Sequence, residues 1–553
     1  MKSTFSRILL TGVLTILIIS CAQKEIPDSD QKQYHIPHLK TQGETTQLIV
    51  KGEPFLILGG ELGNSSFTSV EYMEPIWPKL KAMNLNTILV PVYWELIESE
   101  EGIFDFKLFD QLVTKARNQD LKLVLLWFAS WKNSMSSHAP GWVKKEQERF
   151  PRIKDDNGNS HEILTPFSEN NLQADIKAFV ALMKHIKEID ENEQTIIMVQ
   201  PENEIGMLPV ARDYHPLANK KFEEEVPIEF IDYLEKNKEN LVPEFYDVWA
   251  GNGFKTSGTW EDVFGKDTHT DEIFMAWYYS KFTNKVIKAG KEIYPLPMFV
   301  NAALNRPGRE PGRGYPSAGP LPHLMDVWKA AGPSIDFLSP DFYNPDFKHW
   351  CDLYTRQGNP LFVPEHRFDN TVAAKAAYAF GHYEAMGFSP FSIESTESTE
   401  DEPLGKMYNL LQQLSPMITK QHGQNKIEGV MFDKENNENI FQMGDYEFTV
   451  RHSYTLGYEA GARNETWDMC GAIFIQTGNN EFYIAGSGIV ATFKNINNPN
   501  RTVGILKVDE GYFEDGEWKV LRHLNGDQIH QGRHVRTFAD HYSIQRVELY
   551  HYE

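Results

Sequence analysis

Eight short apolar runs, separated by longer segments, are the feature that most limits the folds open to this chain of 553 residues. A run that is apolar throughout is typical of a strand buried on both faces, as in a parallel sheet covered by helices. The region between the first and last run therefore predicts a parallel α/β architecture. The runs are residues 55–60, 87–92, 123–126, 195–201, 297–300, 335–339, 360–364 and 387–393.

Helical periodicity fills the segments between the runs. In residues 106–116 and 176–186, apolar side chains recur at steps of three and four, as on one face of a helix. Eight alternations of strand and helix fit a (β/α)8 TIM barrel, which we expect to occupy residues 45–425. A doubly wound open sheet would show the same alternation, but its nucleotide-binding form needs a glycine-rich phosphate turn, and the sequence contains none.

Residues 426–553 differ in character from the rest of the chain. Their strand-like runs, such as 472–476 and 490–493, are short and are broken by Gly, Asn and Asp. Asp515 and Gly516 form a hairpin-turn signal between two further runs. We expect a smaller, sandwich-like all-β domain here, which could bind carbohydrate or serve only to buttress the barrel.

The first residues resemble an export signal. Residues 1–20 have a basic start and an apolar stretch that is too short to cross a membrane. The segment that ends at Cys21 resembles the lipobox of bacterial lipoproteins, which implies lipidation of Cys21 and export across the inner membrane. A polar tether over residues 21–44 would then carry a periplasmic or outer-membrane lipoprotein. The alternative is a signal peptide that is cleaved elsewhere, with Cys21 incidental.

Charge and cysteine content exclude several classes of partner. The formal net charge of −23 repels nucleic acids and anionic membranes, so we expect any membrane attachment to come through the lipid alone. Cys351 and Cys470 could form one bridge, although a chain of this length does not need one. Cysteine and histidine spacings typical of metal sites are lacking, so we expect neither a metal nor a cofactor.

Two of the apolar runs end on glutamates. The fourth is followed by Asn203 and Glu204, and the seventh by Glu365. In a parallel barrel all strands end at one rim, where barrel enzymes keep their reactive groups. Glycosidic bond cleavage with retention needs one protonated and one ionised carboxyl about 5–5.5 Å apart, and Asn203 could bind the sugar's 2-hydroxyl. A single such Glu would be an ordinary solvated strand end, but the pair favours a glycosidase.

Several motifs resemble glycosyl hydrolase family 35 β-galactosidases. The resemblance implies that Glu204 is the acid/base and Glu365 the nucleophile. Common family members carry His-Tyr where this chain has Gly63 and Asn64, and Val where it has Pro201. The matching segments are residues 60–62, 93–95, 100–106 and 200–206, and residues 59–66 and 127–134 resemble a bacterial subgroup with a β-rich C-terminal domain.

Other strand-end residues are candidates for the site. Glu202 competes with Glu204 for the acid role on pattern alone, and only the resemblance selects Glu204. Each of the expected sugar-binding side chains has an ordinary structural alternative, which is a salt bridge for the acids and core packing for the aromatic rings. The expected sugar-binding residues are Asn203, Glu61, Tyr93, Glu95, Trp131 and Tyr343.

The function expected from the resemblance is hydrolysis of carbohydrate. We expect a retaining exo-β-galactosidase that removes terminal β-galactosyl residues from oligosaccharides or polysaccharide side chains by double displacement. One alternative is another retaining β-glycosidase of the same clan, such as a glucosidase or fucosidase. The other is a non-catalytic surface lipoprotein that binds glycans. The sequence does not indicate the oligomeric state.

Overall fold

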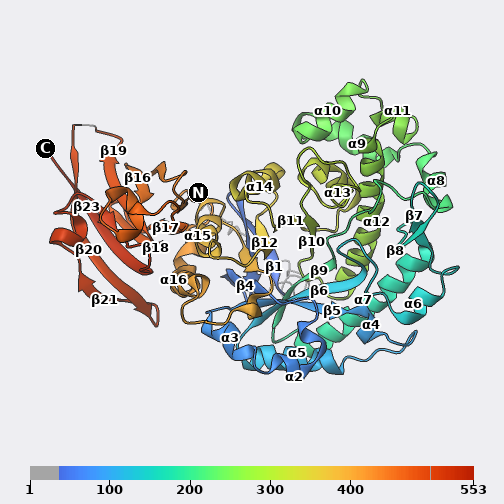
Figure 1. Ribbon diagram of the computed structural model, residues 1–553, viewed down its shortest axis with the longest axis horizontal. Helices are drawn as coiled ribbons and strands as arrows, with labels where there is room; N and C mark the ends of the chain where they lie inside the picture. Colours follow the sequence, from blue (N-terminus) through green and yellow to red (C-terminus); the bar gives the residue numbers. More distant parts are fainter. Residues whose placement is uncertain (1–35, 499) are drawn as a thin grey trace, which may run out of the picture.

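The computed structural model describes residues 36–553 except residue 499. A central barrel carries a β-rich domain at one end of the molecule, drawn in red, and a group of helices at the other, drawn in green (Figure 1). In this described part, none of the helices is both long and apolar enough to span a bilayer. The expected signal segment and Cys21 lie outside the described residues.

The expected tether ends earlier than predicted. Residues His38–Gln42 form strand β1, which pairs antiparallel with β2 (Thr45–Val50), and β2 pairs with β3 (Glu53–Phe55). The sequence of β1 carries little apolar signal, since its order comes from backbone hydrogen bonds to β2.

All eight predicted runs are strands of one parallel sheet, which confirms the predicted barrel. The sheet order is β10-β11-β12-β13-β4-β5-β6-β9. Between β9 and β10 the barrel closes through one bridge, Val199 with Met298, and a hydrogen bond of 3.0 Å from Val199 N to the Pro297 carbonyl. The strands are β4 (Ile57–Glu61), β5 (Thr87–Tyr93), β6 (Lys122–Lys132), β9 (Ile196–Asn203), β10 (Phe299–Ala303), β11 (Phe337–Phe342), β12 (Phe362–His366) and β13 (Gly387–Pro390).

Amphipathic helices cover the outside of the barrel. Helix α5 buries Phe109, Leu112 and Val113, so the predicted spacing of three and four residues marks its inner face. Helix α7 begins where the Ser168 side chain accepts a hydrogen bond from the Asn171 amide. The main outer helices are α3 (Trp77–Ala82), α5 (Lys107–Asn118), α7 (Glu169–Asp190), α12 (Thr268–Ile293), α13 (Met325–Ala331), α14 (Phe347–Tyr354), α15 (Val372–His382) and α16 (Pro403–Gln421).

The end of the barrel where the strands begin is filled with apolar side chains. Phe299 stacks on Phe337 with ring centroids 5.2 Å apart and meets the edge of Phe362 at 5.1 Å. Leu48 and Val50, both from β2, belong to the same cluster. The small sheet β1-β2-β3 therefore plugs this end of the barrel.

A group of short helices follows β9 at the opposite rim. Phe230 lies against Phe245, Trp260, Phe264 and Trp277, so the group has an aromatic core of its own. Because it begins where a barrel strand ends, it stands over the face that holds the strand-end side chains (Figure 1). The helices are α8 (Pro216–Phe222), α9 (Ile228–Asn237), α10 (Pro243–Gly251) and α11 (Trp260–Phe264).

The C-terminal region is all-β, as predicted. Its six-stranded sheet has the order β14-β17-β18-β23-β20-β21, and its four-stranded sheet the order β15-β16-β19-β22. The strands are β14 (Ile427–Phe432), β15 (Glu438–Met443), β16 (Tyr446–His452), β17 (Cys470–Gln476), β18 (Glu481–Ser487), β19 (Ile489–Asn495), β20 (Thr502–Glu514), β21 (Glu517–His523), β22 (Val535–Arg536) and β23 (Ser543–Tyr552).

The central strands β17 and β18 of the six-stranded sheet are buried on both faces. Along β17, Ile473 and Ile475 belong to the core of the barrel domain, while Phe474 belongs to the core between the two β-sheets. Glycines allow the close approach to α15, since a Cβ on Gly429 would lie 2.8 Å from the Ala377 carbonyl. This contact packs the C-terminal domain against the barrel.

The two described cysteines do not pair. Cys351 lies in α14 and Cys470 begins β17, and both thiols are buried and free. The bridge that the sequence allows is therefore absent.

Candidate active site

The end of β9 has a strained backbone that separates two neighbouring glutamates. Glu202 has φ 64° and Glu204 has φ 43°, in the left-handed region that non-glycine residues seldom adopt. Hydrogen bonds hold the turn: the Glu204 amide donates to Asn301 Oδ1 at 2.9 Å, and the Ser134 amide donates to the Glu204 carbonyl at 3.1 Å. The strain is thus compensated by contacts with β10 and with the segment after β6.

The strained turn decides between the two candidate acids. The Glu202 carboxylate accepts a hydrogen bond of 2.6 Å from the Trp131 amide, and burial and the neighbouring Asp175 raise its pKa well above the ordinary range. Glu204 instead has a carboxylate oxygen within 4.8 Å of oxygens on Glu365 and Asp341. Glu204 and Glu365 therefore form the pair that the sequence predicts, and Glu202 lies apart from it.

Four buried carboxyls meet at the strand ends. The register of β11 and β12 places Asp341 opposite Glu365, and Glu61 at the end of β4 hydrogen-bonds to Glu365. Oxygens of Glu204, Asp341 and Glu365 that lie within 4.8 Å of one another could also hold a cation geometrically. The nearest oxygens of Glu204 and Glu365 are thus closer than the separation of about 6.5–9.5 Å at which inverting glycosidases hold their two carboxyls to leave room for a water.

Each carboxyl of the Glu204–Glu365 pair has its own donor. The Tyr343 hydroxyl donates to Glu365 Oε1, and the Asn133 amide donates to Glu204 Oε2. The Lys132 ammonium, only 7% exposed, donates to Asn203 Oδ1 at 2.8 Å. Lys132 therefore brings a positive charge into the cluster and orients Asn203.

Electrostatics assign different protonation states to the cluster. Burial, and after it the charge of Glu365, raises the pKa of Glu61 and of Asp341 well above the ordinary carboxyl range, so both hold a proton more readily than a free carboxyl does. Burial and the Glu204 charge raise the pKa of Glu365 to about 7, against the lowering effect of Lys132 and of hydrogen bonds from Tyr343 and Glu61. Glu365 therefore changes charge near neutrality.

The cluster opens into a cavity of about 540 Å³. Buried polar atoms beside it have no hydrogen-bond partner within the described residues, namely Glu61 Oε1, Asn64 Oδ1, Asn203 Nδ2, Asp341 Oδ1 and Glu365 Oε2. Unpaired buried polar groups are costly, so they call for a ligand rich in hydroxyls or for water. The lining residues are Asn64, Lys132, Asn133, Glu204, Ala303, Leu304, Asn305, Arg306, Tyr315, Pro316, Asp341, Tyr343, Asn344, Pro345, Glu365, Arg367 and Phe391.

The structure brings some predicted sugar-binding residues to the site and not others. Glu61, Asn203 and Tyr343 contact the carboxyl cluster as described above. Tyr93 is buried behind the lining, against Phe128 and His138. Glu95 points elsewhere, since its carboxylate pairs with His138 at 3.0 Å and its side chain is 37% exposed.

Trp131 does not reach the cavity. It is completely buried, its indole donates to the Leu164 carbonyl at 3.1 Å, and its ring packs on Phe282 at 4.6 Å. The cause is a register shift between β6 and β9 after Trp127, which places Lys132 rather than Trp131 at the rim. The expectation that Trp131 binds sugar is therefore wrong, and Trp131 is a core residue.

Several site residues were outside the sequence prediction. Asn301 and Asp341 follow the fifth and sixth apolar runs, so the strand-end rule that selects the glutamates could also have found them. Lys132 and Asn133 depend on the irregular end of β6, which leaves no periodic signal. His366, beside the nucleophile, is structural: it is buried between Phe342 and Phe388, and its ring lies 3.2 Å from Lys375 Nζ.

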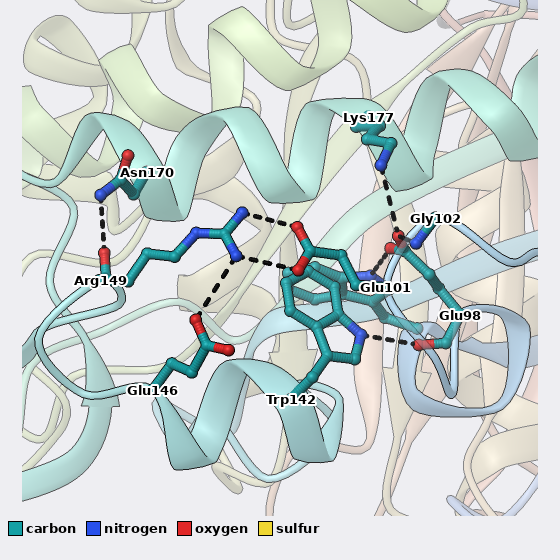
Figure 2. A network of polar contacts seen from close by, with 9 residues as sticks. Glu98, Glu101, Gly102, Trp142, Glu146, Arg149, Asn170 and Lys177 are labelled. Atoms are coloured by element: carbon teal, nitrogen blue, oxygen red, sulfur yellow. Dashed lines mark hydrogen bonds and ion pairs between the residues drawn. The ribbon is translucent and has the colours of Figure 1, made fainter.

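The motif at residues 100–106 supports the rim without entering the cavity. Glu98, which is buried, accepts hydrogen bonds from the Trp94 indole at 2.9 Å and from the Gly102 amide at 2.7 Å. Arg149 binds both carboxylate oxygens of Glu101, at 2.6 and 2.9 Å (Figure 2). These contacts tie the segment after β5 to the loop at Arg149, which is a structural role.

Comparison with known families finds two matches. The model for Glycosyl hydrolases family 35 matches residues 47–266, and a model for a domain of unknown function (DUF5597) matches residues 404–536. The first range contains Glu61, Asn203 and Glu204, while Glu365 lies between the two ranges.

Similar proteins share limited parts of the chain. A β-galactosidase of Xanthomonas manihotis is 28% identical over 177 residues, which are 31% of this chain and 27% of that protein. Beta-galactosidase 14 of Arabidopsis thaliana is 26% identical over 210 residues, or 36% of this chain and 21% of that protein. The chain thus spans about a quarter of the length of these relatives.

Comparison with solved structures finds partial likenesses. The β-galactosidase from Bacillus circulans sp. alkalophilus is 14% identical, with a TM-score of 0.45 over 66% of this chain and 57% of that chain. The catalytic domain of β-amylase from Paenibacillus polymyxa is 14% identical, with a TM-score of 0.43 over 63% of this chain and 96% of that chain.

Proposed function

We propose that the protein is a retaining exo-β-galactosidase, because residues 47–266 match the model for Glycosyl hydrolases family 35. Its substrates would be oligosaccharides or polysaccharide side chains that end in a β-galactosyl residue. The observation that carries the proposal is the buried pair Glu204 and Glu365, whose carboxylate oxygens approach within 4.8 Å at the ends of two barrel strands.

In the first step Glu365 is the nucleophile. Two hydroxyl donors, Tyr343 and the protonated Glu61, stabilise its anion. The Glu365 carboxylate attacks the anomeric carbon, and the bond to the leaving oxygen breaks as that oxygen takes the proton of Glu204. The products are a covalent glycosyl ester on Glu365 and the released alcohol.

In the second step Glu204 is the base. It removes a proton from water as the water oxygen attacks the anomeric carbon, which frees Glu365 as carboxylate and returns the proton to Glu204. One proton shared by Glu204 and Glu365 is enough for both steps. The first step needs this proton on Glu204 and the charge on Glu365, and the hydroxyl donor Tyr343 favours the charged form of Glu365.

The terminal sugar would occupy the buried part of the cavity. Asn203 Nδ2 and Glu61 Oε1, both without partners in the described part of the chain, offer a donor and an acceptor to sugar hydroxyls. Lys132 holds Asn203 by its amide oxygen, so the amide nitrogen is presented to the ligand. Hydrogen bonds of this kind would help to stabilise the oxocarbenium-like transition state.

Two other functions remain alternatives. A related β-glycosidase, such as a glucosidase or fucosidase, would use the same carboxyls with a different pocket wall, and Asn64 lines that wall where common family members differ. A non-catalytic glycan-binding lipoprotein would have no need of two buried carboxyls so close together, because their mutual repulsion opposes folding.

The decisive experiment is a screen of nitrophenyl β-glycosides with the purified protein. We expect turnover of the galactoside above that of the glucoside and fucoside, with the β-anomer of galactose appearing first in a proton NMR time course. Faster turnover of another sugar would identify the alternative glycosidase, and initial formation of the α-anomer would exclude the double displacement. No turnover of any glycoside would favour the binding protein.

We also propose that the enzyme acts as a lipoprotein attached through Cys21. The acidic body offers no electrostatic attraction to an anionic bilayer, so acyl chains would supply the anchoring. The wild type should partition into detergent with bacterial membranes, and Cys21→Ser should be released or left unprocessed. Recovery of the wild type only in the soluble periplasmic fraction, without Cys21 at its N-terminus, would contradict this.

A further inference from the structure

A second cavity, of about 400 Å³, adjoins the catalytic one. Asn305, Arg306 and Tyr315 line both cavities, so the loop that carries them is a shared wall. Helices α10, α12 and α14 contribute further lining residues of the second cavity. A ligand longer than one sugar could therefore extend from the carboxyl cluster over this wall.

The acidic side chains of the second cavity are already paired. Glu244 binds Arg356 at 2.8 Å, and the buried Glu272 binds His323 at 2.9 Å. The Tyr315 hydroxyl also donates to Glu272, at 3.3 Å, which fixes the ring in the shared wall. Neither acid is therefore free to attract a cation into the cavity.

Three arginines around the two cavities are not paired. Arg306 lies in the shared wall, Arg309 in the second cavity, and Arg367 at the mouth of the catalytic cavity, and all three are exposed. Within residues 36–553, apart from residue 499, no carboxylate lies within ion-pair distance of any of them. Arg313 on the same loop lies outside both linings and pairs with Asp156 at 3.9 Å.

The unpaired positive charges around the two cavities contrast with the negative net charge of the whole chain. The chain carries a net charge of −23. Among the other exposed arginines, Arg149 and Arg451 bind glutamates, while Arg463 and Arg533 have no carboxylate within ion-pair distance in the described part of the chain. A guanidinium binds carboxylate, sulfate and phosphate groups through paired N–H donors, and it is always charged. Free arginines beside a cavity therefore indicate an anionic ligand.

The arginines lie on the side where the leaving group must be. Glu61 and Asn203 are buried beside the carboxyl cluster, so a terminal sugar that reaches their unpaired atoms would lie on the buried side of the cavity. The rest of an exo-cleaved substrate must then extend toward the open, solvent-exposed side, where Arg306 and Arg367 lie.

We propose that the sugar units next to the cleaved galactosyl residue carry a negative charge, which Arg306 binds together with Arg309 or Arg367. The charged group is a uronate carboxylate or a sulfate ester, since both fit a guanidinium. This inference rests on the proposed galactosidase function and names its substrate class as acidic glycans.

The test compares galactosides that differ only in the charge of the leaving group. The probes are 4-carboxyphenyl, 4-sulfooxyphenyl and neutral 4-carbamoylphenyl β-galactosides, and the readout is kcat/KM for each. We expect the better anionic probe to exceed the neutral one by about tenfold, as for a charge-assisted hydrogen bond at a partly exposed site. The preference should shrink as salt rises from low ionic strength, because exposed charges are screened.

Variants of Arg306 and Arg313 test whether Arg306 causes the preference for anionic probes. Arg306→Ala should abolish most of the anionic preference, and Arg306→Lys should restore part of it. Arg313→Ala, on the same loop, removes a positive charge outside both cavities and should keep the preference; circular dichroism melting checks that all three variants are folded. The carboxyphenyl and sulfooxyphenyl probes distinguish the uronate from the sulfate.

Equal kcat/KM for charged and neutral probes, or a preference that survives in Arg306→Ala, would overturn the inference while leaving the galactosidase intact. Failure of the proposed function is separate, because nitrophenyl β-galactoside would then not be hydrolysed at all. In that case the inference also fails.

Discussion

The two ends of the barrel interior are built from the same strands but contain opposite chemistry. Where the strands begin, Ile57, Leu89, Phe299, Phe337 and Phe362 form an apolar cluster closed by β2. Where the strands end, the cluster consists of buried carboxyls and one lysine, namely Glu61, Lys132, Glu204, Asp341 and Glu365. Within one strand, the residues near its start are apolar and pack in the core, and those at its end carry ionisable side chains.

The two ends also differ in what they contribute to stability. Burying the aromatic rings stabilises the fold, because it removes apolar area from water. Burying several carboxyls that repel one another opposes folding, and the left-handed turn at Glu202 and Glu204 adds strain. The stabilisation at the apolar end therefore offsets the free-energy cost of the buried carboxyls and the strained turn at the other end. Substitutions at the reactive end should thus change activity, and those at the apolar end stability.

The largest expected effect is that of Glu365→Gln. Turnover should fall by at least about a thousandfold, since an amide cannot form the covalent ester and removal of a nucleophile costs at least this much. A 2-fluorogalactoside should label Glu365 in the wild type, as read by peptide mass spectrometry. Label on another carboxylate would refute the assignment.

The same variant should not lose stability. The pKa of Glu365 is raised in the folded state to about 7 from 4.5, so the folded state binds the extra proton and the wild type loses stability as pH rises through this window. Glu365→Gln has no such loss. Its melting temperature should match or exceed that of the wild type at pH 8, and a clear drop would mean that Glu365 is needed for folding.

Glu204→Ala should have the next largest effect, and one that depends on the leaving group. Loss of a general acid costs about 10²–10⁴-fold for poor leaving groups, while an activated phenol leaves without a proton. Azide should rescue the second step and give a β-galactosyl azide, detected by NMR. Equal losses for good and poor leaving groups, without the azide product, would return the acid role to Glu202.

Phe362→Ala tests the apolar end. It removes a ring that contacts Phe299 and Phe337 at the base of the barrel, and it should lower the free energy of unfolding by about 3–5 kcal/mol. Urea unfolding measures the loss, and kcat per folded molecule should stay unchanged. A fall in kcat of the fully folded variant would show that packing at the apolar end also affects the geometry of the carboxyl cluster.

Tyr343→Phe should have the smallest effect, seen chiefly in the pH profile. The hydroxyl lowers the pKa of Glu365 by donating to its carboxylate, so its loss raises that pKa. The acid limb of kcat/KM, which follows deprotonation of Glu365, should move to higher pH. An acid limb that stays in place would show that another group sets the ionisation of the nucleophile.

Apolar periodicity was enough to place all eight barrel strands, because strands buried on both faces must be apolar along their length. It also placed Glu204 and Glu365 at the same rim, since parallel strands end together. The all-β character of the C-terminal region followed from its short, interrupted runs, whereas its contact with α15 through Gly429 did not, because a glycine in a strand carries no signal of its partner.

The irregular parts of the backbone determine which side chains face the cavity. The register shift after Trp127 buries Trp131 and brings Lys132 to the rim, and the left-handed turn turns Glu202 away from Glu365. A pattern of alternating residues assumes a regular strand, so it fails where a strand bulges or ends. The unpaired Arg306 is a further case, because whether a charge finds a partner depends on the packing of segments distant in the chain.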